Sequence, residues 1–203
     1  MPAFPPTNQR AVTTPGTVYE VDGQAGWIYV CQVANDGTLG FLRIRSATPE
    51  APEFTRDLPL FSRFLVATPS IGRALREGQF RKVGPKALHP DLAFKQATVL
   101  WPVATTHVSA FAADGTAFET TVDDPAIQDF EVMAVWDAIH HLPARLVADY
   151  GTEPAGWHVG GPMWRERRVH EEYARRFPNQ ARRQLPVGWI PAEPAPPSNP
   201  EKV

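Results

Sequence analysis

Three histidines and one glutamate are the side chains of this 203-residue chain that are best suited to acid–base or metal chemistry. His140 and His141 are adjacent, Glu131 precedes them closely, and His107 lies further upstream. Imidazole and carboxylate groups bind metals or transfer protons when a fold brings them together. Adjacent residues, however, point to opposite sides of a strand and diverge by about 100° on a helix. The pattern favours a packing or capping role at a helix start for the two adjacent histidines. It leaves an enzyme with a dispersed histidine–carboxylate site as an alternative.

The sequence contains none of the common nucleotide-binding or catalytic motifs. No glycine-rich run precedes a Lys-Ser or Lys-Thr pair, no G-x-G-x-x-G follows a predicted strand, and none of the five serines lies in G-x-S-x-G. The sequence HEE at 170–172 resembles the first half of a metalloprotease helix but lacks the second histidine. We therefore expect no catalytic residue, no metal and no cofactor, and predict that the protein is not an enzyme.

Cys31 is the only cysteine, which excludes an internal disulfide and a multi-cysteine zinc site. It ends the apolar run WIYVC at 27–31, so we expect a buried, unreactive side chain. The N-terminal residues lack the charged and long apolar regions of a secretion signal. The longest uncharged stretch, 96–113, is too polar to cross a bilayer. We expect a cytoplasmic protein without membrane contact.

Acidic residues are concentrated between 119 and 137, where six occur without a single lysine or arginine. Such a stretch can complement a basic partner, because charged fields steer association and set specificity. If the partner is a nuclease, the carboxylates can mimic phosphate in its basic groove. Solvated loop charges, paired in part with basic residues of the same chain, are the alternative. The candidate binding residues are Asp123, Asp124, Asp129, Glu131 and Asp137.

A basic segment follows at 163–183, with seven arginines and three glutamates. Its mixture of arginines, Trp164 and Tyr173 is also found on RNA-binding surfaces. An amphipathic helix whose arginine stems cover apolar surface explains the same pattern. The whole chain has 20 basic and 22 acidic residues, a net charge of −2, which argues against a dedicated nucleic-acid binder. A small-barrel RNA- or peptide-binding module therefore stays an alternative only.

The first two-thirds of the chain is typical of β structure. Short apolar and β-branched segments are separated by turn signals such as NDG at 35–37 and DG at 114–115. Helical spacing appears only later, at 142–150 before Gly151 and at 163–183. We predict an α+β fold: a strongly bent antiparallel sheet or small SH3-like barrel, followed by one or two C-terminal helices. The expected strands are 17–21, 26–33, 39–45, 61–67, 80–83, 94–101, 107–112, 116–122 and 132–136.

Prolines mark both ends of the chain. Four of the 22 prolines lie in residues 1–15 and six in 186–203. Proline-rich chain favours extended, weakly packed backbone. We predict a flexible N-terminal tail (1–15), an α+β domain (16–151), a helical extension (152–185) and a proline-rich C-terminal tail (186–203).

The order of segments resembles that of a known family. From residue 15 the chain reads PGTVYEVDGQAGWIYVCQV, followed after a turn by LGFLRI. Later segments are FRKVG at 80–84, FKQ at 94–96, a hairpin at 114–115 and VMAVWDAIHHLPARLVADY at 132–150. This pattern is similar to the immunity protein 26 family of bacterial polymorphic-toxin systems. It covers residues 15–151, and the part from Trp157 onward departs from the family pattern.

The resemblance implies a non-catalytic immunity protein, or antitoxin. Such a protein binds a cognate toxin effector domain and blocks its active site or substrate surface. The partner would be that toxin domain, and neither nucleic acid nor a membrane. Because families of this kind serve toxins of several activities, the resemblance does not indicate the toxin's chemistry.

Overall fold

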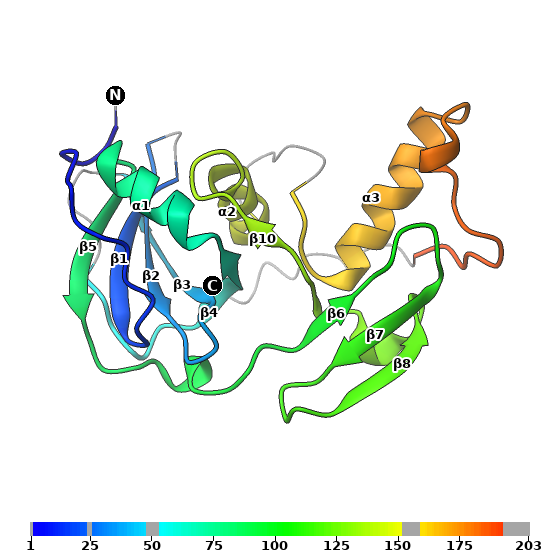
Figure 1. Ribbon diagram of the computed structural model, residues 1–203, viewed down its shortest axis with the longest axis horizontal. Helices are drawn as coiled ribbons and strands as arrows, with labels where there is room; N and C mark the ends of the chain where they lie inside the picture. Colours follow the sequence, from blue (N-terminus) through cyan, green and yellow to red (C-terminus); the bar gives the residue numbers. More distant parts are fainter. Residues whose placement is uncertain (1, 24–25, 48–52, 152–158, 193–203) are drawn as a thin grey trace.

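The computed structural model describes residues 2–23, 26–47, 53–151 and 159–192. Within these ranges the chain forms two β-sheets and three α-helices, so the predicted α+β class is confirmed. Figure 1 shows the six-stranded sheet on one side of the molecule and the four-stranded sheet on the other. The last helix lies beside the smaller sheet.

The six-stranded sheet is strongly curled, as predicted, and has the order β10-β4-β3-β2-β1-β5. Its neighbours are antiparallel except β10 and β4, which are parallel. Register shifts in three strand pairs bend the sheet. It is a half-barrel whose edge strands are β10 and β5. The strands are β1 (Thr17–Asp22), β2 (Ile28–Val33), β3 (Leu39–Ser46), β4 (Leu60–Val66), β5 (Phe80–Pro85) and β10 (Val135–Trp136).

The second sheet has four strands in the order β8-β7-β6-β9. The β7–β8 hairpin turns at Asp114-Gly115, as predicted, and Gly115 has the positive φ of 91° that glycine accepts easily. The strand expected at 132–136 is instead two short strands, one in each sheet, so the chain crosses between the sheets there. The strands are β6 (Thr98–Leu100), β7 (His107–Phe111), β8 (Ala117–Thr121) and β9 (Glu131–Val132).

The helices begin and end where local chemistry dictates. In α1 (Thr68–Arg76) and α2 (Leu142–Tyr150) a proline occupies the first turn, where its missing N–H costs nothing. Gly151, with φ of 75°, ends α2 as predicted. The third helix, α3 (Met163–Arg176), ends before Pro178 and is shorter than the predicted segment 163–183.

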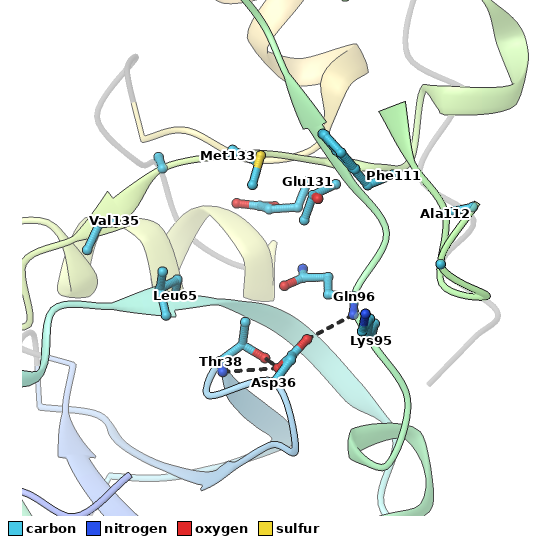
Figure 2. Close-up of a pocket in the computed structure, with 13 residues that line it drawn as sticks. Asp36, Thr38, Leu65, Lys95, Gln96, Phe111, Ala112, Glu131, Met133 and Val135 are labelled. Carbon is cyan, nitrogen blue, oxygen red and sulfur yellow. Dashed lines mark hydrogen bonds between the residues drawn. The ribbon is translucent and has the colours of Figure 1, made fainter. Parts of the chain in front are cut away.

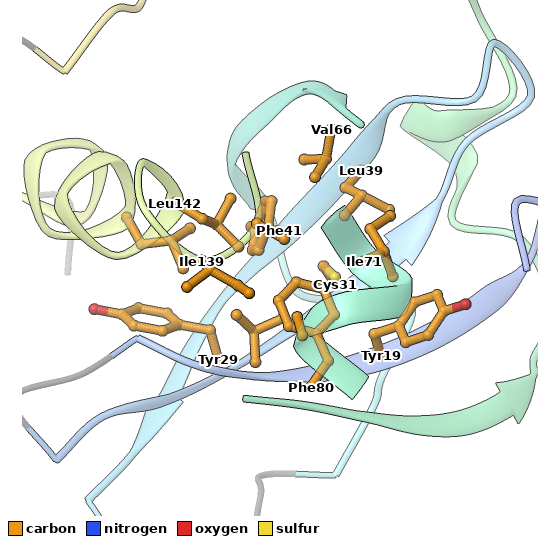
Figure 3. Packing of buried hydrophobic residues seen from close by; sticks show 14 of the residues in the cluster. Tyr19, Tyr29, Cys31, Leu39, Phe41, Val66, Ile71, Phe80, Ile139 and Leu142 are labelled. Atoms are coloured by element: carbon orange, nitrogen blue, oxygen red, sulfur yellow. The ribbon is translucent and has the colours of Figure 1, made fainter. Parts of the chain in front are cut away.

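The described residues form three hydrophobic clusters. The smallest consists of Val18, Val30 and Leu42, and the other two are the separate cores of the two sheets. The larger one fills the half-barrel beneath α1 and α2, with Cys31 fully buried at its centre, as predicted for a small apolar side chain (Figure 3). The smaller one joins the four-stranded sheet to α3 through Met163. Among the described residues the two clusters share no member. Contacts of another kind must therefore fix one sheet relative to the other.

The segments that we expected to be loose are in part packed. Phe4 is 3% exposed, and its backbone N–H donates to the Gly78 carbonyl at 3.0 Å. The Tyr19 hydroxyl is within hydrogen-bond distance of both the N–H and the carbonyl of Val12. Residues 186–192 return to α3, where Glu171 accepts from Trp189 and from the Ala192 backbone. The described part of each predicted tail is thus tied to the fold, and residues 152–158 and 193–203 lie outside the described ranges.

Candidate functional site

A groove of about 440 Å³ lies where the two sheets meet; we call it the inter-sheet groove (Figure 2). One wall comes from β4 and the turn before β3, and the other from the end of β7 and the crossing between β9 and β10. The loop between β5 and β6 closes one side. The side chains that line it include Asp36, Leu65, Lys95, Phe111, Met133 and Val135.

Strand register determines which side chains face this groove. Val99 and Ala110 are partners on the face of the second sheet that packs on Met163 of α3. Because side chains alternate along a strand, Leu100 and Phe111 point to the opposite face. On the first sheet, Leu65 and Val135 are partners in the parallel β4–β10 pair. Leu65, Val135 and Phe111 therefore line the groove, and Leu100 lies on the same sheet face as Phe111.

These apolar side chains are exposed to solvent, although residues next to them in the sequence belong to the hydrophobic clusters. Leu65 is 40% exposed, Leu100 49%, Phe111 37%, Met133 52% and Val135 61%. We call these five residues the apolar patch. Contiguous exposed apolar surface with a polar margin is typical of protein-binding sites.

Asp36 fixes the polar edge of the groove. It accepts hydrogen bonds from the backbone N–H of Thr38 at 3.1 Å and of Gln96 at 2.9 Å, and from Arg63 Nη2 at 2.7 Å. Partial burial raises the pKa of Asp36, but these hydrogen bonds and that of the Thr38 hydroxyl outweigh it and hold the pKa below its usual value. Asp36 is therefore an ionised structural group that ties the loop at 95–96 to the first sheet.

Four charged side chains form a buried network behind the groove; we call it the ion-pair clamp. Arg145 donates to both carboxylate oxygens of Glu131 at 2.9 Å, and its Nε donates to Asp149 at 2.6 Å. Asp149 also accepts from Arg165 Nη2 at 2.5 Å and from the Ser62 hydroxyl. Arg145 is only 2% exposed. All the charges of the clamp are thus paired.

Burial and pairing oppose each other in the clamp. Burial raises the pKa of Glu131, and the hydrogen bonds and charge of Arg145 reduce that effect. Burial lowers the pKa of Arg145, but Glu131 and Asp149 outweigh it, so the guanidinium stays charged. Each charge in the pair is tolerated because the other is present.

The clamp joins the two sheets. Glu131 on β9 and Arg165 on α3 belong with the second sheet, whereas Arg145 and Asp149 lie on α2 against the first. Both ion pairs therefore cross the boundary between the two hydrophobic clusters. The clamp thus links the two sheets beside the groove, as do the hydrogen bonds of Asp36 and Arg63 to the loop that precedes β6. A second cavity, of about 310 Å³, lies on the other side of the clamp and is lined by all four clamp residues.

The five acidic residues predicted to bind a toxin are not gathered at one surface. Asp124 caps the turn after β8, accepting from the Ala126 backbone at 2.8 Å, and its hydrogen bond with the Thr120 hydroxyl lowers its pKa. Asp123 precedes it and is half-buried. Asp129 is exposed and lines the 310 Å³ cavity. Of the five, only Glu131 lines the inter-sheet groove.

The fifth acid, Asp137, has an internal role at the start of α2. It accepts from the backbone N–H of Ile139 and His140 and pairs with Arg73 at 2.5 Å. Partial burial raises the pKa of Asp137, but the two backbone donors and Arg73 outweigh it, so the pKa lies below its usual value. This carboxylate is ionised and bound within the chain.

The histidines and Glu131 do not form a joint site in the described part of the chain. His141 is the N-cap residue of α2 and packs edge-on against Trp136, as predicted for a histidine at a helix start. His107 and His140 are exposed, and no hydrogen bond or ion pair joins any of the three to Glu131. Within the same residues, no cluster of three or more His, Cys, Asp or Glu side chains is placed to hold a metal ion.

Sequence reasoning did not identify the apolar patch. One signal was present in the sequence: Leu100 and Phe111 each follow a small or β-branched apolar residue, Val99 and Ala110, so the two expected strands are apolar on both faces. Nothing local marks Leu65, Met133 or Val135, because their proximity depends on how the two sheets are placed.

Searches against protein-family models, curated proteins and solved structures found no match. The resemblance to immunity protein 26 stays a prediction. In the described ranges, none of the helices is both long and apolar enough to traverse a membrane.

Proposed function

We propose that this chain is a non-catalytic protein-binding protein, and that its inter-sheet groove and apolar patch form the binding surface. The observation that carries the proposal is that four exposed apolar side chains line the groove where the two sheets meet, namely Leu65, Phe111, Met133 and Val135. Exposing them costs free energy, which a protein partner recovers by covering them. Polar groups at the margin, such as Asp36 and Thr98, give the arrangement of an apolar centre with a polar rim.

The surface is also preorganised for binding. The groove walls combine strand residues with turns and loops that hydrogen bonds tie to the sheets, and the ion-pair clamp links the two sheets. A rigid surface loses less conformational entropy when it binds, so more of the contact free energy contributes to affinity. Occlusion of an enzyme's active site by an inhibitor requires such a surface.

The specific function that we propose is immunity: the protein neutralises a bacterial polymorphic-toxin effector domain in the cytoplasm by covering its active site or substrate surface. The resemblance of residues 15–151 to immunity protein 26 supports this choice. Glu131 and Asp137 are not part of the proposed charged contact, because arginines of the same chain already pair with these carboxylates.

Co-expression tests this function. The protein is produced in cells together with the polymorphic-toxin C-terminal domain encoded immediately upstream of its gene, and growth and co-purification are measured. The expected result is rescue of growth and a stable one-to-one complex. An active toxin that still kills the cells and forms no complex would contradict the immunity function.

The acidic stretch provides a second, electrostatic contribution to the proposal. Asp123, Asp124 and Asp129 are outside the clamp; Asp129 is exposed, and the other two are partly exposed. If they steer a basic toxin, the variant D123K/D124K/D129K should associate more slowly, and the difference should disappear at high salt. An association rate equal to that of the wild type at low salt would exclude these residues from binding.

A further inference from the structure

The charged residues that line the inter-sheet groove are Asp36, Glu131 and Lys95. Asp36 is paired with Arg63 at 2.7 Å, and Glu131 with Arg145 at 2.9 Å. Lys95 is exposed, and within the described residues it makes neither a hydrogen bond nor an ion pair. Within the described part of the chain, the lining of the groove therefore carries one positive charge without a partner.

The backbone on both sides of Lys95 is anchored to the first sheet. The carbonyl of Phe94 accepts from Arg63 Nη2 at 2.7 Å, and the backbone N–H of Gln96 donates to Asp36 at 2.9 Å. The Gln96 side chain donates in addition to the Arg63 carbonyl. Figure 2 shows Lys95 beside Gln96 at the edge of the groove. The ammonium group thus extends from a fixed point of the rim.

We infer that Lys95 determines the specificity of the groove, which takes a partner segment presenting an apolar side chain with a carboxylate beside it. The apolar side chain covers Leu65, Met133 and Val135, and the carboxylate pairs with Lys95. A basic partner segment would place like charges together and is disfavoured. This inference rests on the proposed function, because it assumes that the groove binds a protein.

Three synthetic peptides that differ only in charge test the inference. They are acetyl-Asp-Leu-Phe-Asp-amide, its neutral counterpart with asparagines and its basic counterpart with lysines. Binding to the full chain is measured by titration with methyl and backbone NMR at low salt. We expect the acidic peptide to bind about 1.5- to fivefold more tightly than the neutral one, the range for a solvent-exposed ion pair. The basic peptide should bind most weakly, and shifts should appear at the apolar patch.

The variants K95M and K95R test whether the positive charge of Lys95 causes the preference for the acidic peptide. K95M should abolish the ratio of affinities between the acidic and the neutral peptide, and K95R should keep that ratio. Since Lys95 has an exposed side chain, neither variant should unfold the protein. A preference that persists in K95M, or equal affinity of the wild type for the three peptides, would overturn the inference.

The variant V135D distinguishes failure of this inference from failure of the proposed function. If the groove binds apolar segments, V135D weakens the neutral as well as the acidic peptide. One possible result is that V135D weakens both peptides while peptide charge has no effect on binding to the wild type. The groove would then still be a binding site, but Lys95 would not determine its specificity. No binding of any peptide to the wild type contradicts the inference and counts against the groove itself.

Discussion

Cys31 shows how burial controls the chemistry of a single side chain. It is fully buried in the larger hydrophobic cluster, and burial raises the pKa of its thiol far above the usual value (Figure 3). The reactive thiolate is therefore scarce and shielded. We expect no reaction of the native protein with an aromatic disulfide reagent, and one equivalent of reaction after unfolding in guanidinium chloride. Rapid labelling of one thiol in the native protein would contradict the described core.

Glu166 on α3 predicts a pH-dependent stability. It is 7% exposed, and its Oε1 atom has no hydrogen-bond partner in the described residues. Burial raises the pKa of Glu166, and the charges of Arg165 and Arg145 reduce that effect only in part. The pKa of Glu166 is higher in the folded than in the unfolded protein. The contribution of Glu166 to the free energy of unfolding is therefore most favourable below the unfolded pKa near 4.5 and becomes less favourable as the pH rises through the folded pKa.

The substitution E166Q should therefore stabilise the protein at neutral pH. We expect a gain of about 1 kcal/mol in the free energy of unfolding at pH 7, since a buried charge without full compensation is removed. The gain should shrink toward pH 4. The control is E172Q on the same helix, because Glu172 is paired with Arg175 and its hydrogen bonds with Arg175 lower its pKa. Urea unfolding at pH 4 and pH 7 measures the change in the free energy of unfolding for both variants. If E166Q gains the same stability at pH 4 as at pH 7, burial of the Glu166 charge is not the cause.

Residue roles were predictable where local sequence determines them. The burial of Cys31 follows from its apolar run, and the position of His141 at a helix start follows from the proline after it. Glu131 was grouped with its acidic neighbours in sequence, but it faces Arg145, which lies 14 residues later. Only tertiary structure shows that pairing, because nothing local relates the two positions.

At the scale of elements, α2 carries the contacts that hold the sheets together. Arg145 and Asp149 are one helical turn apart, so both side chains project from the same face of α2 toward Glu131 and Arg165. Removing one partner leaves a buried charge unpaired, whereas replacing both by apolar groups is often tolerated.

The substitution E131A should accordingly lower the free energy of unfolding by about 3–5 kcal/mol. The nearby D129A, which removes an exposed acid, is the control and should change it by less than about 0.5 kcal/mol. The double variant E131M/R145M should recover much of the lost stability. Chemical denaturation measures all three, and equal stabilities of E131A and D129A would show that the clamp contributes nothing.

Most elements could be predicted because their signals are local. The NDG and DG turns, the proline start of α2 and its end at Gly151 agree with the structure, whereas the helix α1 was not predicted. The single strand expected at 132–136 was wrong, because its two halves pair with different sheets. The sequence is apolar on both sides of that crossing, so periodicity alone could not divide it.

At the scale of the whole molecule, function depends on how two sheets with separate cores are placed. The fold class followed from the order of strands and helices, but the groove did not, because it is formed by residues from β4, β7 and the β9–β10 crossing. The acidic stretch drew attention in the sequence because its residues are consecutive. The residues of the apolar patch are spread from position 65 to position 135, and only the folded structure shows that they are exposed.

The central claim is that a protein partner binds the inter-sheet groove, and two valines of one sheet test it directly. Val135 on β10 lines the groove and is 61% exposed; Val83 on β5, at the other edge of the same sheet, is 45% exposed and lies outside the groove. The measurement is the dissociation constant of the purified complex with the co-expressed toxin domain, for V135D and V83D. The account predicts that V135D weakens binding by about 30-fold or more, as expected for a central contact, and that V83D changes it by less than about twofold. Equal affinities of the two variants would contradict it.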